Sequence, residues 1–375
     1  MNARVKKPFL PQTLPPQNIK WEYLIPMIGK AHAGIARYDG LLSNLINPNV
    51  LLSPLTTKEA VISSRIEGTQ ASLEDVFEFE AGLFEEKSEN IKQDVQEIVN
   101  YRKTLLAAEN ELEHREITIN LIRQMHSILM DNVRGKNKNP GEFRKIQNWR
   151  GTPDTPIEYA RFIPPDPLVV DEYMEKLVNF INSNYTDEIV QIAIVHAQFE
   201  IIHPFLDGNG RIGRLLIPLF LYYKKLLSRP VLYISEYLEA HRNEYYDRLL
   251  GVSESNDWQS WIEYFLKAVT VQSENNIQKA QEIIGLYNEL KEEFIKVTRS
   301  QFAIPLLDAF FTKPVINSST VLQLAKIQNR VTGNDLLNKL LDHGMIVLLK
   351  KGKGNKPAIY AIPKLINIVE GKDVV

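Results

Sequence analysis

The sequence predicts an all-α protein whose helical core carries one β-hairpin flap and is followed by a small winged helix-turn-helix domain. Apolar residues recur at helical spacing through most of the first 290 positions. One interruption, at 137–167, is rich in glycine, proline and aromatic residues. After residue 300 the periodic segments become short and two strand-like runs appear. A chain of 375 residues is long enough for about two or three folding units.

Helices are expected on both sides of the interruption. The first 20 residues contain four prolines and predict an extended arm. The segment 210–227 is apolar nearly all round, so we expect it at the centre of the core. Within the interruption, the runs 143–149 and 159–163 predict the two strands of the flap. The predicted helices are 23–45, 56–67, 76–84, 91–112, 117–130, 167–182, 187–202, 210–227, 236–253 and 258–290.

The C-terminal segment has a different pattern, with short elements and a basic turn at 351–356. A helix-turn-helix followed by a basic hairpin is the outline of a winged helix. The predicted elements are helices at 300–311, 318–326 and 332–343 and strands at 345–350 and 358–362.

The composition excludes several classes of site. Lys and Arg total 44 against 46 acidic residues, so the net charge of −2 provides no global field for nucleic acid or an anionic membrane. The absence of cysteine excludes disulfides, thiolate metal sites and a cysteine nucleophile, and it fits a reducing compartment. The N-terminal segment lacks the apolar core of a signal peptide, and no run approaches the length of a membrane span. We therefore expect a cytoplasmic protein without a membrane partner.

The strongest local feature is the segment 203–214, with the sequence HPFLDGNGRIGR. A histidine ends one predicted helix, a glycine-rich turn follows, and a buried helix begins at once. Glycines at 208 and 210 permit positive φ and let backbone N–H groups turn inward, and the new helix adds its N-terminal donors and dipole. Together these features predict an anion nest sized for a di- or triphosphate.

The charged side chains of this segment fit the same nest. Arg211 and Arg214 lie three positions apart, so both guanidinium groups can project from the first turn of the helix. A cation at a helix N-terminus is disfavoured by the positive end of the helix dipole. An anion bound at that end would explain why two arginines are placed there. Asp207 provides a hard oxygen ligand for Mg²⁺. His203 is placed to take a proton from an incoming hydroxyl while phosphorus is attacked.

A purely structural role is the alternative for this segment. The glycines would then only close a helix-to-helix turn, Asp207 and Asn209 would cap it, and His203 would be a packed imidazole. We favour the functional interpretation because a base, a metal ligand, two glycines and two phased arginines share one short segment.

At this point the chain resembles the Fic family, whose signature is H-P-F-x-(D/N)-G-N-G-R-x-x-R, and 203–214 matches it without departure. The resemblance covers roughly 53–266 and includes 97–101, 140–144 and 245–246. It implies a Fic-type helical core with a flap, and transfer of AMP from ATP, with Mg²⁺, to a Ser, Thr or Tyr hydroxyl of a protein. A phosphate-transferring branch has lysine at the position of Gly210, so kinase activity is not expected. A phosphocholine-transferring branch leaves another donor open.

The resemblance also implies roles for single residues. His203 is expected to be the general base and Asp207 the magnesium ligand, while Arg214 holds the γ-phosphate. The flap, 147–165, is expected to hold the target by strand-like main-chain pairing. Tyr245 and Tyr246 correspond to the nucleoside pocket, although paired tyrosines on a helix are also common in cores. The residues expected to bind the nucleotide are Asp207, Gly208, Asn209, Gly210, Arg211, Gly213, Arg214, Tyr245 and Tyr246.

A second motif precedes the core. The sequence SSRIEG, 63–68, ends a predicted helix with Gly68 at the left-handed cap, and Glu67 lies where the helix dipole disfavours an anion. An ordinary exposed glutamate is the alternative. Fic proteins carry an inhibitory motif (S/T)-x-x-x-E-(G/N), which Ser63, Glu67 and Gly68 match. This match implies that Glu67 pairs with Arg214 and inhibits the enzyme. A weaker hypothesis is that a mobile Glu67 also aligns water for AMP removal, which would make the protein bifunctional.

The resemblance suggests how the chain is divided. The catalytic core is expected to contain the inhibitory helix, 54–68, and the flap, 143–165. The expected parts are an N-terminal arm and helix at 1–52, the core at 53–270, a linker helix at 271–299 and the winged-helix-like domain at 300–375.

Other functions remain open. The C-terminal domain could make the chain a DNA-binding regulator with a nucleotide-sensing core, with 332–343 as recognition helix and Lys350, Lys351, Lys353 and Lys356 in the wing. That helix is hardly basic, so we favour partner recognition or a homodimer contact. The chain has no Walker motif, which argues against a plain ATPase. It has no third metal ligand near His196 and His203 in the sequence, which argues against a metal hydrolase. Self-modification on a tyrosine or serine of the chain is the default prediction for the acceptor.

Overall fold

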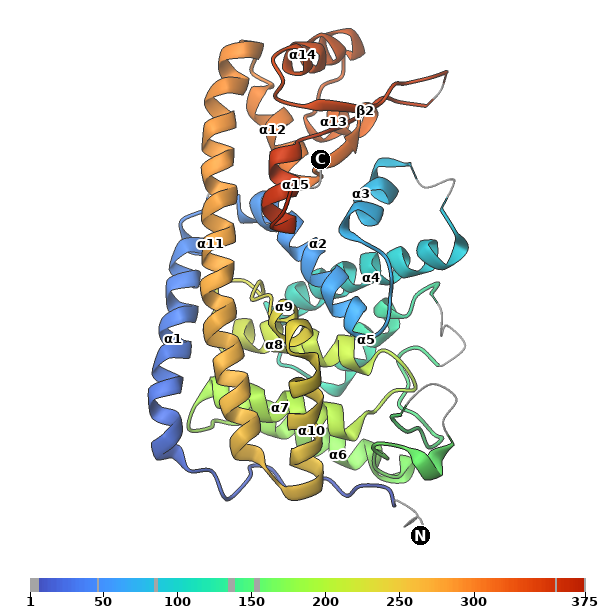
Figure 1. The fold of residues 1–375 in the computed structure, drawn as a ribbon, viewed down its shortest axis with the longest axis vertical. Coiled ribbons are helices and arrows are strands. Elements are labelled where there is room, and N and C mark those ends of the chain that lie inside the picture. The colour runs from blue at the N-terminus through green and yellow to red at the C-terminus, as the bar shows by residue number, and fades with distance from the viewer. Residues whose placement is uncertain are drawn as a thin grey trace. The chain divides into compact units, whose positions relative to one another are not determined.

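The computed structural model describes residues 7–45, 47–83, 87–133, 139–151, 156–354 and 356–373 (Figure 1). Helices make up most of these residues, so the all-α prediction is confirmed. The helices before the flap are α1 (Trp21–Ser43), α2 (Pro48–Ile66), α3 (Leu73–Ala81), α4 (Glu89–Leu112) and α5 (Ile119–Leu129). Those between the flap and the C-terminal segment are α6 (Val170–Asn182), α7 (Glu188–Ile202), α8 (Asn209–Tyr223), α9 (Ser235–Ala240), α10 (Arg242–Ser255) and α11 (Trp258–Thr298).

Four predicted helices differ clearly from the structure, and one of them is α11, which continues to Thr298 beyond its predicted end at 290. The predicted helix 236–253 is two helices, because His241 has a non-helical φ of −116°. α6 is preceded by a separate 3₁₀ turn, η2 (Pro167–Val169). α2 begins well before its predicted start at 56, because the helix continues through Pro54. A proline inside a helix removes one backbone hydrogen bond, so sequence alone favours a break there.

The chain folds into two compact units that interleave along the sequence. Unit 1 consists of 1–40, 66–68 and 100–274. Unit 2 consists of 41–65, 69–99 and 275–375. Helices α1, α2, α4 and α11 contribute residues to both units. The division into parts beginning at 1, 53, 271 and 300 stays a prediction.

The core of unit 1 is built around α7 and α8. α7 is buried from Ile189 to Ile202 and α8 from Asn209 to Leu221, which confirms a central helix in the predicted segment 210–227. α6 and α10 pack against α7, and α5 packs against α6 and α8. The chain between α7 and α8 is the segment that holds the motif. Packing therefore fixes the positions of the two helices that the motif connects.

The flap has less strand than predicted. Its two arms meet in an antiparallel bridge, in which the N–H groups of Arg150 and Phe162 each donate to the other's carbonyl at 2.9 and 3.2 Å. The strand predicted at 159–163 is wrong at its start, because Tyr159 ends a 3₁₀ turn, η1 (Ile157–Tyr159). The strand predicted at 143–149 is also wrong, because the Arg144 N–H donates to the Pro204 carbonyl and not to a partner strand. Residues 152–155 of the flap lie outside the described residues.

The C-terminal part of unit 2 contains the predicted helices and hairpin. Two elements were missed, the three-residue strand β1 and the helix α15, which begins at Pro363. The sheet is antiparallel with the order β1-β3-β2, and Ala361 of the central strand is opposite Val315 and Val347. That this arrangement is a winged helix stays a prediction, and Asn355 of the predicted turn lies outside the described residues. The elements are α12 (Ala303–Thr312), β1 (Val315–Asn317), α13 (Ser318–Leu324), α14 (Arg330–Asp342), β2 (Val347–Lys350), β3 (Ile359–Ala361) and α15 (Pro363–Glu370).

Hydropathy along the helices bears on membrane association. Within the part of the chain that the structure describes, no helix combines the length and the apolar character needed to cross a bilayer.

Trp261 of α11 tests the packing of the helix that leads into the motif. Its indole is fully buried and donates a hydrogen bond of 2.7 Å to the carbonyl of Ala193 on α7. Trp261→Phe removes the indole hydrogen bond and creates a void, so we expect the free energy of unfolding to fall by about 2–4 kcal/mol. Urea denaturation measures this change. The matched control is Trp149→Phe at a side chain that is 44% exposed, where we expect a change below about 0.5 kcal/mol; equal losses would contradict the prediction.

Candidate functional site

The motif loop is a tight turn between α7 and α8 with two residues of left-handed backbone. His203 ends α7 with φ 49° and ψ 61°, and Gly208 precedes α8 with φ 75°. The positive φ predicted for Gly208 is confirmed, whereas that predicted for Gly210 is wrong, because Gly210 lies inside α8. Glycine is needed there for another reason: a Cβ atom on Gly210 would overlap the Glu67 carboxylate.

Asn209 holds the loop closed. Its Oδ1 accepts the N–H of Phe205 and its Nδ2 donates to the Phe205 carbonyl, both at 2.8 Å. Asn209 is only 2% exposed. The described contacts therefore give Asn209 a bracing function, and its expected contact with phosphate stays a prediction.

His126 of α5 supports the same loop and was not identified from the sequence. Its Nδ1 accepts the N–H of Gly141 at 2.8 Å, so Nε2 carries the proton and donates to the Asp207 carbonyl at 3.0 Å. The imidazole stacks on Phe205 with ring centroids 3.8 Å apart. Burial lowers the pKa of His126 to about 4, so the ring is neutral at physiological pH. A single histidine far upstream gives no sequence signal for this contact.

The imidazole of His203 is oriented by a backbone carbonyl. Nδ1 lies 3.3 Å from the backbone carbonyl oxygen of Glu200. Because a carbonyl oxygen can only accept a hydrogen bond, Nδ1 carries the proton and Nε2 has the lone pair. Burial, followed by the charge of Arg150, lowers the pKa of His203 to about 3. Arg144 fixes the backbone at this point, because its Nε donates to the His203 carbonyl at 2.9 Å and its Nη2 to the Pro165 carbonyl at 2.5 Å. The neutral imidazole is therefore a proton acceptor held in one orientation.

Asp207 presents its carboxylate at the edge of the loop. The side chain is 37% exposed, and Oδ1 accepts the N–H of Gly208 at 2.7 Å. Oδ1 also lies 3.7 Å from the Arg211 guanidinium, whose side chain is 3% exposed. An accessible carboxylate beside a helix N-terminus fits the oxygen ligand that Mg²⁺ prefers.

Glu67 forms an ion pair with Arg214. It directly follows the last residue of α2, and Gly68 has φ 104°, as predicted for the cap. Oε1 of Glu67 lies 2.8 Å from Nη2 of Arg214, whose side chain is 1% exposed. Burial alone would raise the pKa of Glu67, but the charges of Arg214 and then Arg150 outweigh it and lower the pKa to about 2. The expected pair is thus present, and Ser63 lies one turn earlier on α2.

A second carboxylate extends this cluster. Nη1 of Arg150 lies 3.5 Å from Oε2 of Glu200, and Nη2 lies 3.8 Å from Oε2 of Glu67. The Glu200 side chain is 3% exposed, and burial raises its pKa to about 6 although Arg150 opposes this shift. Both residues were missed from the sequence. Glu200 is the acidic residue within the largely apolar run IVQIAIVHAQFEII, 189–202 of α7, and this is a signal that could have identified it.

A cavity of about 680 Å³ lies beside the cluster. Tyr246 lines it, with the Arg150 guanidinium 5.5 Å from the centre of its ring. Tyr245 is 1% exposed, and its hydroxyl donates to Nε2 of His196 at 2.9 Å. The other ring nitrogen of His196 donates to the Gly213 carbonyl at 3.0 Å, so both ring nitrogens of His196 are used in packing α7 against its neighbours. The lining residues are Ile66, Glu67, Arg150, Gly151, Tyr159, Arg161, Phe162, Glu200, Ile201, Arg242, Tyr246, Leu249, Leu250 and Ser253.

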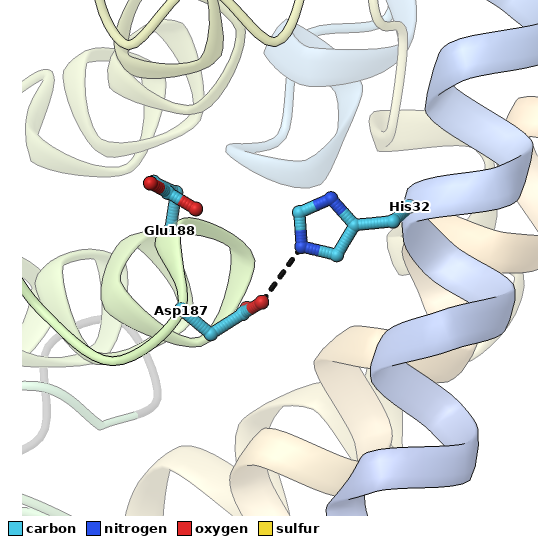
Figure 2. A group of neighbouring side chains, drawn as sticks. All are labelled: His32, Asp187 and Glu188. Atoms are coloured by element: carbon cyan, nitrogen blue, oxygen red, sulfur yellow. Dashed lines mark hydrogen bonds and ion pairs between the residues drawn. The ribbon is translucent and has the colours of Figure 1, made fainter.

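A separate group of possible metal ligands lies between α1 and α7. His32 donates to Asp187, with Nε2 and Oδ2 2.7 Å apart, while Glu188 lies beside them (Figure 2). Asp187 already caps α7, because its Oδ1 accepts the N–H groups of Ile189 and Val190 at 3.0 and 2.9 Å. These contacts explain the group as a helix cap and an ion pair.

Two family models match the chain. The model described as Fic/DOC family N-terminal matches residues 25–110, and the model described as Fic/DOC family matches residues 116–221. Together they cover more than half of the 375 residues, and the second includes the motif loop.

Curated relatives match in part. A protein of Aquifex aeolicus named "Probable protein adenylyltransferase aq_aa38" is 30% identical over 151 residues, which are 38% of this chain and 47% of that protein. "Protein adenylyltransferase fic-1" of Caenorhabditis elegans is 32% identical over 170 residues, which are 44% of this chain and 29% of that protein. The chain therefore spans less than half the length of these relatives.

Solved structures share the fold. A Fic family protein from Desulfovibrio desulfuricans has a TM-score of 0.56 at 21% identity, covering 93% of this chain and 98% of that one. Residues 134–508 of Fic-1 from C. elegans have a TM-score of 0.51 at 24% identity, covering 70% and 74%. These similarities confirm the predicted helical fold.

The raised pKa of Glu200 predicts a pH-dependent stability difference. Its value is 4.5 as a free side chain and about 6 in the folded chain, so the folded chain holds its proton more tightly. The contribution of Glu200 to the free energy of unfolding consequently falls as the pH rises from about 4.5 to about 6. The wild type keeps this loss at higher pH. Because Gln does not titrate, we expect Glu200→Gln to be more stable by about 1–2 kcal/mol above about pH 7, with little difference below about pH 4.

Urea denaturation at pH values on both sides of this window measures the difference. Glu175→Gln, the same change at an exposed position of α6, is the matched control. A Glu200→Gln effect that does not change with pH would show that the Glu200 pKa is not raised.

Proposed function

The chain belongs to the Fic/DOC family, and from this premise we propose that it is a protein adenylyltransferase, which transfers AMP from ATP to a Ser, Thr or Tyr hydroxyl of a protein. The observation that carries the proposal is the orientation of His203, whose Nδ1 faces the Glu200 carbonyl and whose Nε2 keeps its lone pair at the start of the loop that leads into α8. The names of the relatives point to the same activity.

His203 performs the proton transfer in this proposal. The acceptor hydroxyl gives its proton to Nε2, its oxygen attacks the α-phosphorus, and the bond to the leaving pyrophosphate breaks. The low pKa of His203 keeps the imidazole neutral before the reaction. A bound triphosphate raises that pKa by attraction, which makes His203 a stronger base when the substrate is present.

The nucleotide is placed by the loop and the cavity. Backbone N–H groups at the start of α8 and the guanidinium groups of Arg211 and Arg214 face the phosphates. Asp207 would hold Mg²⁺, which supplies neutralising charge to the phosphates. The nucleoside occupies the cavity against Tyr246. We do not assign Tyr245 to the nucleoside, because its hydroxyl is used by His196.

Glu67 keeps the enzyme inactive in this proposal. Because it occupies Nη2 of Arg214 at 2.8 Å, the guanidinium is not available to orient the γ-phosphate. A second activity, removal of AMP with Glu67 aligning water, is less well supported, because a carboxylate with a pKa of about 2 is a weak base. The acceptor protein pairs with the flap, and the chain itself is one possible acceptor. DNA binding by the C-terminal part, a homodimer and a cytoplasmic location stay predictions.

Label transfer tests the reaction and the inhibitory contact together. We would incubate wild type, Glu67→Gly and His203→Ala with Mg²⁺ and ATP labelled on the α- or the γ-phosphate. We expect Glu67→Gly to incorporate α-label at least about tenfold faster than wild type, because Arg214 becomes available. His203→Ala in the Glu67→Gly background should lose at least about a hundredfold in rate.

The position of the label separates the alternatives. Transfer of γ-label would identify a kinase, and release of orthophosphate without protein labelling would identify an ATPase. Retained α-label in the His203→Ala variant would sink the proposed mechanism.

Removal of metal tests the assignment of Asp207. EDTA should abolish transfer by Glu67→Gly, and added Mg²⁺ should restore it. Asp207→Asn in that background should raise the Mg²⁺ concentration for half-maximal transfer by about tenfold or more, because a carboxylate ligand is lost. Asp171→Asn, at an exposed position of α6, is the matched control. An unchanged Mg²⁺ requirement in Asp207→Asn would show that another group holds the ion.

A further inference from the structure

Two carboxylates and two guanidinium groups form a connected cluster at the edge of the cavity. Glu67 contacts Arg214 at 2.8 Å, and Arg150 lies between the two carboxylates, 3.8 Å from Glu67 and 3.5 Å from Glu200. Arg150 is in the flap and Glu200 is in α7, three residues before His203. The proposed mechanism uses Glu67 and Arg214 but gives no role to the other two.

Glu200 is held rigidly in an unfavourable position. Its side chain is 3% exposed, and its Oε1 is buried without a hydrogen-bond partner among the described residues. This oxygen packs on Gly213, where an added Cβ atom would overlap Oε1 and lie 3.2 Å from Cδ1 of Phe199. Glycine at the motif position 213 therefore makes room for the Glu200 carboxylate. A buried acid with an unpaired oxygen lowers stability, so packing alone does not explain its presence.

The proposed activation leaves Arg150 with one carboxylate. When Glu67 leaves Arg214, Arg150 also loses its contact with Glu67, and Glu200 is the carboxylate that still pairs with it in the described cluster. An arginine in a flap has many alternative rotamers in water, and an ion pair with a rigid partner reduces them. Arg150 lines the cavity and lies over Tyr246, which is the proposed nucleoside side of the site.

From these contacts we infer that Glu200 is a positioning residue, which keeps Arg150 directed into the cavity as a second cation for the nucleotide once Glu67 has moved away. The inference rests on the proposed function, because it assumes that a polyanionic nucleotide enters this cavity. Glu200 acts on the substrate only through Arg150. Its carboxylate does not touch the reacting atoms.

The sign of one substitution separates this inference from a simple charge effect. Glu200→Gln removes a negative charge close to a site for a polyanion while the shape of the side chain is kept. If the charge acts only directly, ATP is repelled less and its KM falls. If the charge positions Arg150, the KM for ATP rises, because a cation is lost from the site.

The experiment compares variants in the Glu67→Gly background and measures kcat and KM for ATP together with the affinity for Mg-ATP by calorimetry. We expect Glu200→Gln to raise the KM and the Kd by about fivefold to twentyfold, with kcat within about twofold, and Glu200→Asp to have a smaller effect. Arg150→Gln should give a similar rise. The double variant should be no worse than Arg150→Gln alone, because both changes remove one effect. Glu175→Gln is the control.

A lower or unchanged KM and Kd in Glu200→Gln, a loss confined to kcat, or additive effects in the double variant would each overturn the inference. Absence of label transfer by Glu67→Gly would sink the proposed function, while the calorimetric Kd values would still test the position of Arg150. A Glu67→Gly protein that binds no Mg-ATP would overturn both.

Discussion

The charge of one buried guanidinium sets the requirements for the whole site. Arg214 has a side chain that is 1% exposed, and an ion removed from water needs an anion beside it. In this structure Glu67 is that anion. A buried pair adds little net stability, yet loss of one partner costs about 3–5 kcal/mol, so exchange for another anion is far easier than separation. A triphosphate would meet that condition, so the proposed competition between Glu67 and the nucleotide is consistent with the burial of Arg214.

The same requirement explains why the backbone around α8 is so tightly specified. Gly210 must lack a side chain because the Glu67 carboxylate lies against it. His203 adopts φ 49°, which is unfavourable for a residue other than glycine. Arg144 holds this turn through the His203 carbonyl, and Asn209 closes the loop on Phe205. The hydrogen bonds of buried side chains offset the strain of the turn, so the base and the cation keep fixed positions before the substrate binds.

The sequence predicted those features that depend on neighbours along the chain. Periodicity located the helices, and the loop from 203 to 214 was found because its chemistry is contiguous. Arg150, Glu200 and His126 were missed, since their roles arise from packing between distant segments. The flap strands were overestimated because alternation of residues does not show that Arg144 donates to Pro204. The conformation of Gly210 was misjudged for a related reason. Glycine is needed there because the Glu67 carboxylate lies against the backbone, and not because φ is positive.

The two carboxylates of the cluster differ in the property that decides their roles. Glu67 lies just beyond the end of a helix, its side chain is 23% exposed, and two guanidinium groups lower its pKa to about 2. Because its side chain is already partly exposed, it can move into water as an ion once another anion pairs with Arg214. Glu200 is 3% exposed within α7, and burial raises its pKa to about 6. It has no comparable route to water, so Arg150 keeps this partner whichever anion occupies Arg214. In the proposed mechanism one carboxylate is exchangeable and the other is fixed, and this difference would let the site release Glu67 while Arg150 stays in place.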